Sequence, residues 1–172
     1  MKILNIIFYA VWLLIVALLQ PTVIRWIEIF GIGPNIFLIF VIAAALICGK
    51  KAGAVCGLVF GLTLDMLVGR MIGVNALIFL YAGFFVGILC ERFISGSGTL
   101  VAAVITLSAS VLCGIVYYIA YSMVWGDIGF WRALFRVILP EALYTGVLSL
   151  LLFATIRKSF RLIQKRDGMR FV

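Results

Sequence analysis

The chain has 172 residues, of which 66% are hydrophobic and 12% are charged, and its mean hydropathy is +1.31. A soluble domain of this length would be about half apolar and about a quarter charged. The composition excludes a soluble protein and indicates an integral membrane protein, because apolar runs of membrane-spanning length fill almost the whole chain.

Six apolar runs predict an all-α membrane protein with six transmembrane helices in a single domain, residues 1–172. The predicted spans are residues 3–24, 34–49, 52–69, 74–90, 99–125 and 138–156, separated by clusters of glycine, proline and charge. The first run follows a lysine, as a signal peptide does. The sequence Gln20-Pro21-Thr22-Val23 lacks a small-residue cleavage site, so we expect a retained helix.

The basic residues predict the orientation of the spans. With the N-terminus in the cytoplasm, ten of the 14 Lys and Arg residues are cytoplasmic, and the opposite orientation reverses this bias. Both termini are therefore expected inside, with residues 157–172 as a basic cytoplasmic tail. Such a tail attracts anionic lipid headgroups, at about 1 kcal/mol per basic residue near the surface. We expect no nucleic-acid partner, because basic collars of this kind are ordinary on inner-membrane proteins.

The segment 130–139, FWRALFRVIL, has two interpretations. Its large apolar residues share one helical face and its two arginines lie on another, which is typical of a helix in the membrane interface. The alternative is an early start to the sixth span, broken at Pro140.

Four cysteines lie inside apolar runs or at their ends, at positions 48, 56, 90 and 113. The chain has no histidine and no CxxC pair, so the sequence predicts neither a metal site nor a disulfide framework. We expect small core residues here, no cofactor, and no catalytic residues, since no serine or cysteine is accompanied by a base.

The stretch GAVCGLVFGLTLDMLVG, residues 53–69, carries glycines four residues apart on one row of a helix. No hydrophobic effect drives helices together in lipid, so small residues matter because they allow close backbone approach. We predict packing within the chain, with the helix of a partner chain as the alternative. The glycines assigned to helix packing are Gly53, Gly57, Gly61, Gly69, Gly83 and Gly87.

Asp65 shares the row with these glycines. A carboxylate at the centre of a bilayer costs about 2.5–3.5 kcal/mol, and less toward an interface. The third span runs outward from Lys51 to Arg70, which places Asp65 in the outer leaflet. One interpretation is structural, as a partner of Arg70 or a cap on the fourth span. The other is a contact with a ligand or partner.

Polar side chains from five spans share this outer level in the predicted topology. They form the candidate outer polar site, for a ligand or a partner: Gln20, Asn35, Asp65, Asn75 and Glu141.

Residues 19–90 also carry an ordered set of family-like positions. The set comprises Leu19-Gln20, Pro34, Gly53, Gly57, Gly61-Leu62, Asp65, Gly69, Gly73, Asn75-Ala76-Leu77 and Gly83. In these positions the chain resembles the MreD family of bacterial rod shape-determining membrane proteins, although it has Asn35 where many members have aspartate. The resemblance implies a non-enzymatic scaffold of the cell-elongation machinery in the cytoplasmic membrane. The implied partners are MreC, in direct contact, with MreB, RodA and a class B penicillin-binding transpeptidase in the same assembly.

Two alternatives belong to other functional classes. The first is the substrate-binding subunit of an energy-coupling-factor vitamin transporter, whose fold MreD proteins are thought to share. Such a binder should have long, aromatic-rich outer loops, whereas the loop between the third and fourth spans has about four residues. The second is an intramembrane enzyme that uses Asp65 and Glu141 as paired carboxylates.

Overall fold

The computed structural model describes residues 33–68, 71–93, 99–126 and 129–167, and the predicted first span lies outside these ranges. The described part of the chain is helical, without strands. Its elements are α2 (Ile36–Cys48), α3 (Lys50–Val68), α4 (Val74–Phe93), α5 (Thr99–Trp125), α6 (Phe130–Ala133), the π-helical turn η1 (Leu134–Ile138) and α7 (Leu139–Asp167).

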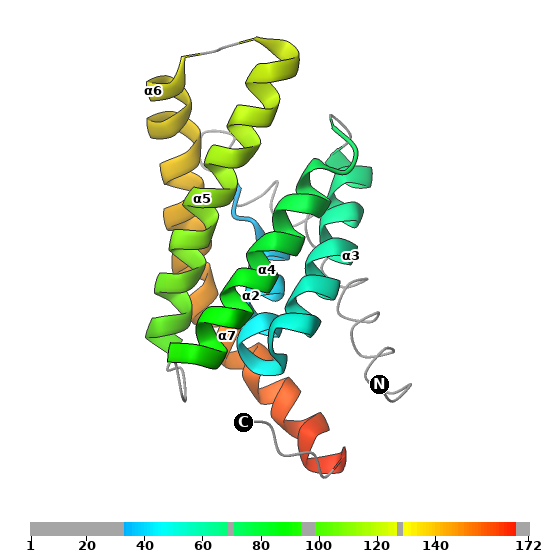
Figure 1. Cartoon of the computed structure of the whole chain (residues 1–172). Helices are drawn as coiled ribbons and strands as arrows, with labels where there is room; N and C mark the ends of the chain where they lie inside the picture. Colours follow the sequence, from blue (N-terminus) through cyan, green and yellow to red (C-terminus); the bar gives the residue numbers. More distant parts are fainter. Residues whose placement is uncertain (1–32, 69–70, 94–98, 127–128, 168–172) are drawn as a thin grey trace.

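The helices form one bundle in which successive turns alternate between two ends (Figure 1). The α3–α4 turn and the neighbouring ends of α5 and α6 lie at one end, and the α2–α3 junction lies at the other. Among the described residues, three helical stretches are long and apolar enough to cross a membrane: Val74–Arg92, Thr99–Trp125 and Phe130–Phe153. The number of spans and their orientation remain predictions.

Helix α2 lies at the centre of the bundle and contacts α3, α4, α5 and α7. Every residue from Ile36 to Ala45 is buried, as expected for a helix that is apolar on all sides. Its aromatic residues meet α3, because the rings of Phe37 and Phe40 lie 5.7 and 6.1 Å from the ring of Phe60. Gly49 alone links α2 to α3, with a positive φ of 82° that favours glycine.

Helices α3 and α4 form an antiparallel hairpin with their glycines at the seam. A Cβ on Gly53 would lie 2.7 Å from the carbonyl oxygen of Gly83, and one on Gly61 would lie 2.6 Å from that of Asn75. A Cβ on Gly57 would overlap the Phe79 carbonyl. A Cβ added at Gly83 or at Gly87 would likewise overlap the α3 backbone. Five of the six packing glycines therefore face an interface within the chain, and Gly69 lies outside the described residues.

The segment 130–139 does not form a separate interfacial helix. It packs against α5 and runs through η1 into α7, so the sixth predicted helix starts early, at Phe130 (Figure 1). The expected break at Pro140 is wrong. A helical proline lacks an N–H donor and its ring clashes with the carbonyl four residues earlier. The π-helical turn, in which Leu139 N–H bonds to the Leu134 oxygen, precedes Pro140 and keeps the helix continuous. At its far end α7 reaches Asp167, so most of the predicted tail is helical.

Candidate functional site

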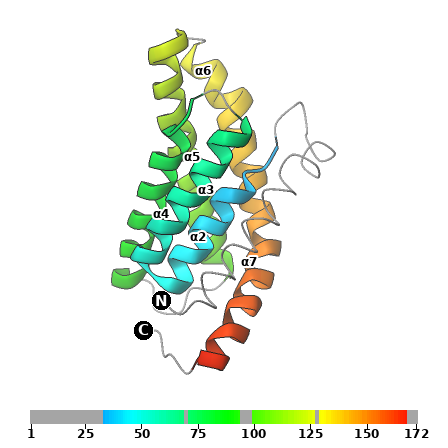
Figure 2. The same ribbon diagram turned by 90° about the vertical axis from the view of Figure 1, so that its right-hand side faces the viewer.

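A cavity of about 430 Å³ lies beside the first turn of α2, between α5, η1 and the start of α7. Helix α2 has 13 residues and α5 has 27, which correspond to about 20 and 40 Å of helix. Consequently α2 begins deeper in the bundle than the α5–α6 end (Figures 1 and 2). The volume is in the range of small-molecule pockets.

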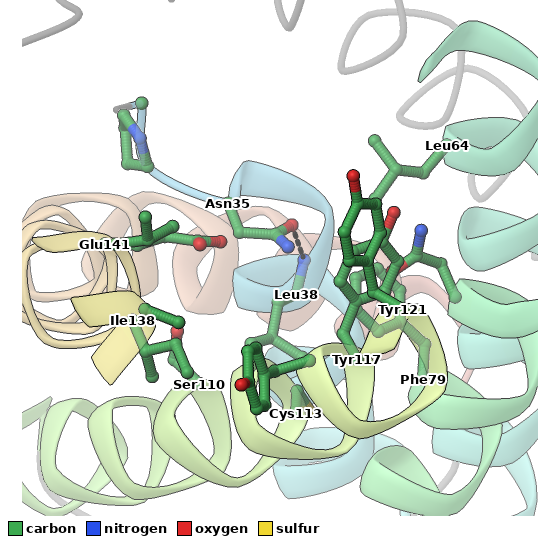
Figure 3. Close-up of a pocket in the computed structure, with 17 residues that line it drawn as sticks. Asn35, Leu38, Leu64, Phe79, Ser110, Cys113, Tyr117, Tyr121, Ile138 and Glu141 are labelled. Atoms are coloured by element: carbon green, nitrogen blue, oxygen red, sulfur yellow. Dashed lines mark hydrogen bonds between the residues drawn. The ribbon is translucent and has the colours of Figure 1, made fainter. Parts of the chain in front are cut away.

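The cavity has a polar part and an aromatic part (Figure 3). Its lining residues are Gly33, Pro34, Asn35, Leu38, Leu64, Asn75, Phe79, Ser110, Cys113, Gly114, Tyr117, Tyr118, Tyr121, Ala133, Val137, Ile138 and Glu141.

Asn35 is the N-cap of α2. Its Oδ1 accepts a hydrogen bond from Leu38 N–H at 3.1 Å, as expected for a residue whose short side chain can satisfy a free helix donor. Its own N–H donates to the Thr145 hydroxyl at 3.0 Å, and Thr145 is fully buried on α7. Asn35 thereby fixes the position of α2 relative to α7.

Glu141 lies in the first turn of α7, with its carboxyl group directed toward Asn35 (Figure 3). The Asn35 side chain is the polar group that this carboxyl group faces (Figure 3). Within the described ranges no lysine or arginine forms an ion pair with Glu141, and the ion pair found there joins Lys50 to Glu91. Among the described residues that line the cavity, Glu141 is the one acid and none is basic.

Ser110, on α5, is 5% exposed and lines the same cavity. Thr106 and Ser108 on this helix donate to the carbonyl oxygens four residues earlier, at 2.7 and 2.9 Å. The Ser110 hydroxyl makes no hydrogen bond to any residue that the structure describes. It is therefore a buried polar group at the cavity wall with hydrogen-bonding capacity to spare.

Asp65 is 2% exposed and caps the start of α4. Its Oδ2 accepts from the N–H groups of Gly73 at 2.8 Å and Ala76 at 3.2 Å. Its Oδ1 accepts from the backbone N–H of Asn75 at 3.3 Å and from the Asn75 side-chain amide at 2.8 Å. Of the alternatives for Asp65, the geometry matches the cap on the fourth helix. A negative group at a helix N-terminus is also favoured by the helix dipole.

A second carboxylate caps the opposite end of the same hairpin. Glu91, near the end of α4, accepts from Lys50 N–H at 3.2 Å and forms an ion pair of 3.0 Å with the Lys50 ammonium group. In the sequence, Glu91 belongs to the charged residues that separate the predicted fourth and fifth spans. The sequence does contain the information needed to predict this cap. Glu91 lies near the end of a helix that runs antiparallel to α3, so it lies beside the N-terminus of α3, where a negative charge is favoured.

The structure brings together only part of the predicted outer polar site. Asn35, Asn75 and Glu141 line the cavity, whereas Asp65 lies behind Asn75 and is not a lining residue. Gln20 lies outside the described residues. Asp65 hydrogen-bonds to Asn75 and Glu141 faces Asn35, so the structure does not pair the two acids as the alternative of an intramembrane enzyme would require.

The contribution of α5 to the cavity was not predicted from the sequence. Its lining residues there include Ser110, Cys113, Gly114, Tyr117 and Tyr121, which recur at helical spacing along one face. None of the four cysteines forms a disulfide, and no group of three or more metal-ligating side chains occurs in the part of the chain that the structure describes.

Comparison with known proteins gives one result. The family model described as rod shape-determining protein MreD matches residues 1–163. No curated protein and no solved structure matches the chain, so similarity to vitamin transporter subunits remains a prediction. A match over almost the whole length shows that this chain belongs to the MreD family of rod shape-determining proteins.

Proposed function

We propose that the chain is a non-enzymatic, multi-pass subunit of the cell-elongation machinery in the bacterial cytoplasmic membrane. In this role it maintains rod shape by binding MreC, in an assembly that also contains MreB, RodA and a class B penicillin-binding transpeptidase. Family membership supports the link to rod shape. The structural support is the α3–α4 hairpin, whose two helices are held rigidly together and can act as a docking surface.

The α3–α4 hairpin is the observation that carries this proposal. Backbone contacts at the glycine seam and a carboxylate cap at each end hold the two helices together. A rigid surface loses little conformational entropy when a partner binds. Because association in lipid depends on van der Waals packing, a preformed surface of this kind favours contact with another membrane helix.

An aromatic cluster on the outer face of α4 is the best candidate contact. Tyr81, Phe84 and Phe85 are 55%, 37% and 58% exposed. The rings of Tyr81 and Phe84 lie 6.3 and 5.9 Å from that of Phe85. Large aromatic residues clustered in this way often dominate the binding energy of an interface.

Copurification of MreC with the tagged chain in mild detergent tests the proposal. Phe84→Ala with Phe85→Ala should reduce MreC recovery at least about fivefold, as expected for interface residues worth about 1 kcal/mol or more. The matched control is Leu112→Ala with Val116→Ala, two exposed residues of α5. It should leave recovery unchanged. Absence of MreC from the wild-type preparation would contradict the proposal.

A second candidate is a small-molecule-binding subunit of a vitamin transporter, because the cavity has the volume of a small-molecule pocket. Against it, the cavity lining comes from helices and from residues just before α2, rather than from the long outer loops expected of a vitamin binder. The test is the same preparation. A transporter ATPase module in place of MreC would favour this candidate.

A further inference from the structure

The charges of the described residues around the cavity are unbalanced. Glu141 contributes a carboxylate, and neither the described lining residues nor any described ion pair supplies a cation to it. An ionised carboxylate removed from water is costly unless it is paired and hydrogen-bonded. The Asn35 side chain faces this carboxylate, which has about four acceptor sites (Figure 3).

The side-chain amides of the lining already face carboxylates. The side-chain amides of Asn35 and Asn75 are directed at Glu141 and Asp65, respectively. The Ser110 hydroxyl is buried without a partner among the described residues, and it can donate one hydrogen bond and accept others. A ligand that donates hydrogen bonds could therefore bind both the Glu141 carboxylate and the Ser110 oxygen.

The aromatic wall has the same preference. Phe79, Tyr117 and Tyr121 lie on the side of the cavity away from Glu141, with Asn35 between them (Figure 3). The faces of aromatic rings carry partial negative charge and attract ammonium and guanidinium groups, by up to about 2 kcal/mol when water is excluded.

We propose that this cavity binds an organic cation, a primary ammonium or a guanidinium group, held between the Glu141 carboxylate and the α5 tyrosines. The cation belongs either to a small amine or to a lysine or arginine side chain of a partner. The inference goes beyond the proposed function, because it assigns a ligand chemistry whichever protein the chain binds.

A pair of probes of equal shape tests the charge preference directly. The purified chain in detergent is titrated with 2-phenylethylammonium and with 2-phenylethanol, its neutral counterpart, and binding is measured by calorimetry. The cation should bind at least about tenfold more tightly, which corresponds to about 1.4 kcal/mol. Equal binding of the two probes, or no binding of the cation, would overturn the inference without affecting MreC recovery.

Variants then locate the site. Glu141→Gln should remove the preference for the cation, and Tyr121→Leu should weaken cation binding without changing the affinity for the alcohol. Glu91→Gln is the matched control, because Glu91 is an acid outside the cavity. It should bind both probes like the wild type. A preference that persists in Glu141→Gln would overturn the assignment.

A competition experiment between the probe and MreC shows whether the natural cation is a small amine or a side chain of the partner. Excess 2-phenylethylammonium is added to the immobilised complex of the chain with MreC. Release of MreC supports a basic side chain of the partner as the natural ligand, and retention of MreC together with probe binding supports a small amine.

Discussion

The side-chain amide of Asn75 donates a hydrogen bond of 2.8 Å to Oδ1 of Asp65, across the turn between α3 and α4. Asn75 also lines the cavity, so the cap that holds the hairpin supports one wall of the candidate site. At the other end of the hairpin Glu91 accepts from Lys50. Each helix thus provides, near its C-terminal end, the carboxylate that caps the N-terminus of the other.

The Asp65 cap should contribute to stability. Asp65→Asn replaces one carboxylate oxygen with an amide NH₂ group, which donates hydrogen bonds. The oxygen lost is either Oδ2, which accepts from two backbone N–H groups, or Oδ1, which accepts from the Asn75 side chain. Leaving buried donors unsatisfied costs about 1–3 kcal/mol, so the free energy of unfolding should fall by that amount. Thermal unfolding in detergent measures it, with Thr63→Val on the same helix as the control. An unchanged midpoint would show that these hydrogen bonds contribute little.

The two caps should not be equivalent. Asp65 is buried, whereas the Lys50 and Glu91 side chains are 41% and 44% exposed, and exposed ion pairs are screened by water and salt. We expect Glu91→Gln to lower the unfolding midpoint less than Asp65→Asn does in the same buffer. A larger loss for Glu91→Gln would reverse this ranking.

The glycine seam should tolerate no larger residue. A Cβ at Gly57 would overlap the Phe79 backbone, so Gly57→Leu must separate α3 from α4 and should cost about 1–3 kcal/mol or more. The yield of folded, monodisperse protein after detergent extraction reports the effect. Val55→Leu, at a position 57% exposed on the same helix, is the control and should extract normally. Equal yields would mean that the seam can open at little cost.

Asn35 and Glu141 should be energetically coupled. Asn35→Asp keeps the oxygen that caps α2 but removes the donor to Glu141 and places two acids together. We expect Asn35→Asp to destabilise the protein and Glu141→Gln to suppress this loss, because the amide introduced by the second substitution would donate to the new carboxylate. A double-mutant cycle of unfolding free energies should give a coupling of about 0.5–3 kcal/mol. Additive effects on the free energy of unfolding would show that the two side chains do not interact energetically.

Much of the fold was predictable from sequence because it depends on local patterns. The apolar runs and their charged or glycine-rich breaks predict helices close to α2, α3, α4 and α5, and the last of these has the predicted bounds, Thr99–Trp125. Glycines four residues apart predict that another helix crosses at close range, although they do not identify which helix it is.

The cavity was not predictable in the same way. It depends on how deep α2 begins and on which face of α5 meets η1, and these are tertiary relationships that no short window contains. Asp65 is predicted to share a level with Asn35 and Glu141, but the backbone N–H groups of Gly73, in the α3–α4 turn, and Ala76, in the first turn of α4, bind its carboxylate and hold it outside the cavity. The continuity of the helix at Pro140 depends on a π-helical turn, which has no simple sequence signature.

Affinity purification of the tagged wild-type chain in mild detergent tests most directly whether the chain acts as an MreC-binding subunit. We predict that MreC is recovered with the chain and that Phe84→Ala with Phe85→Ala reduces its recovery. Recovery of a transporter ATPase module without MreC would contradict this role.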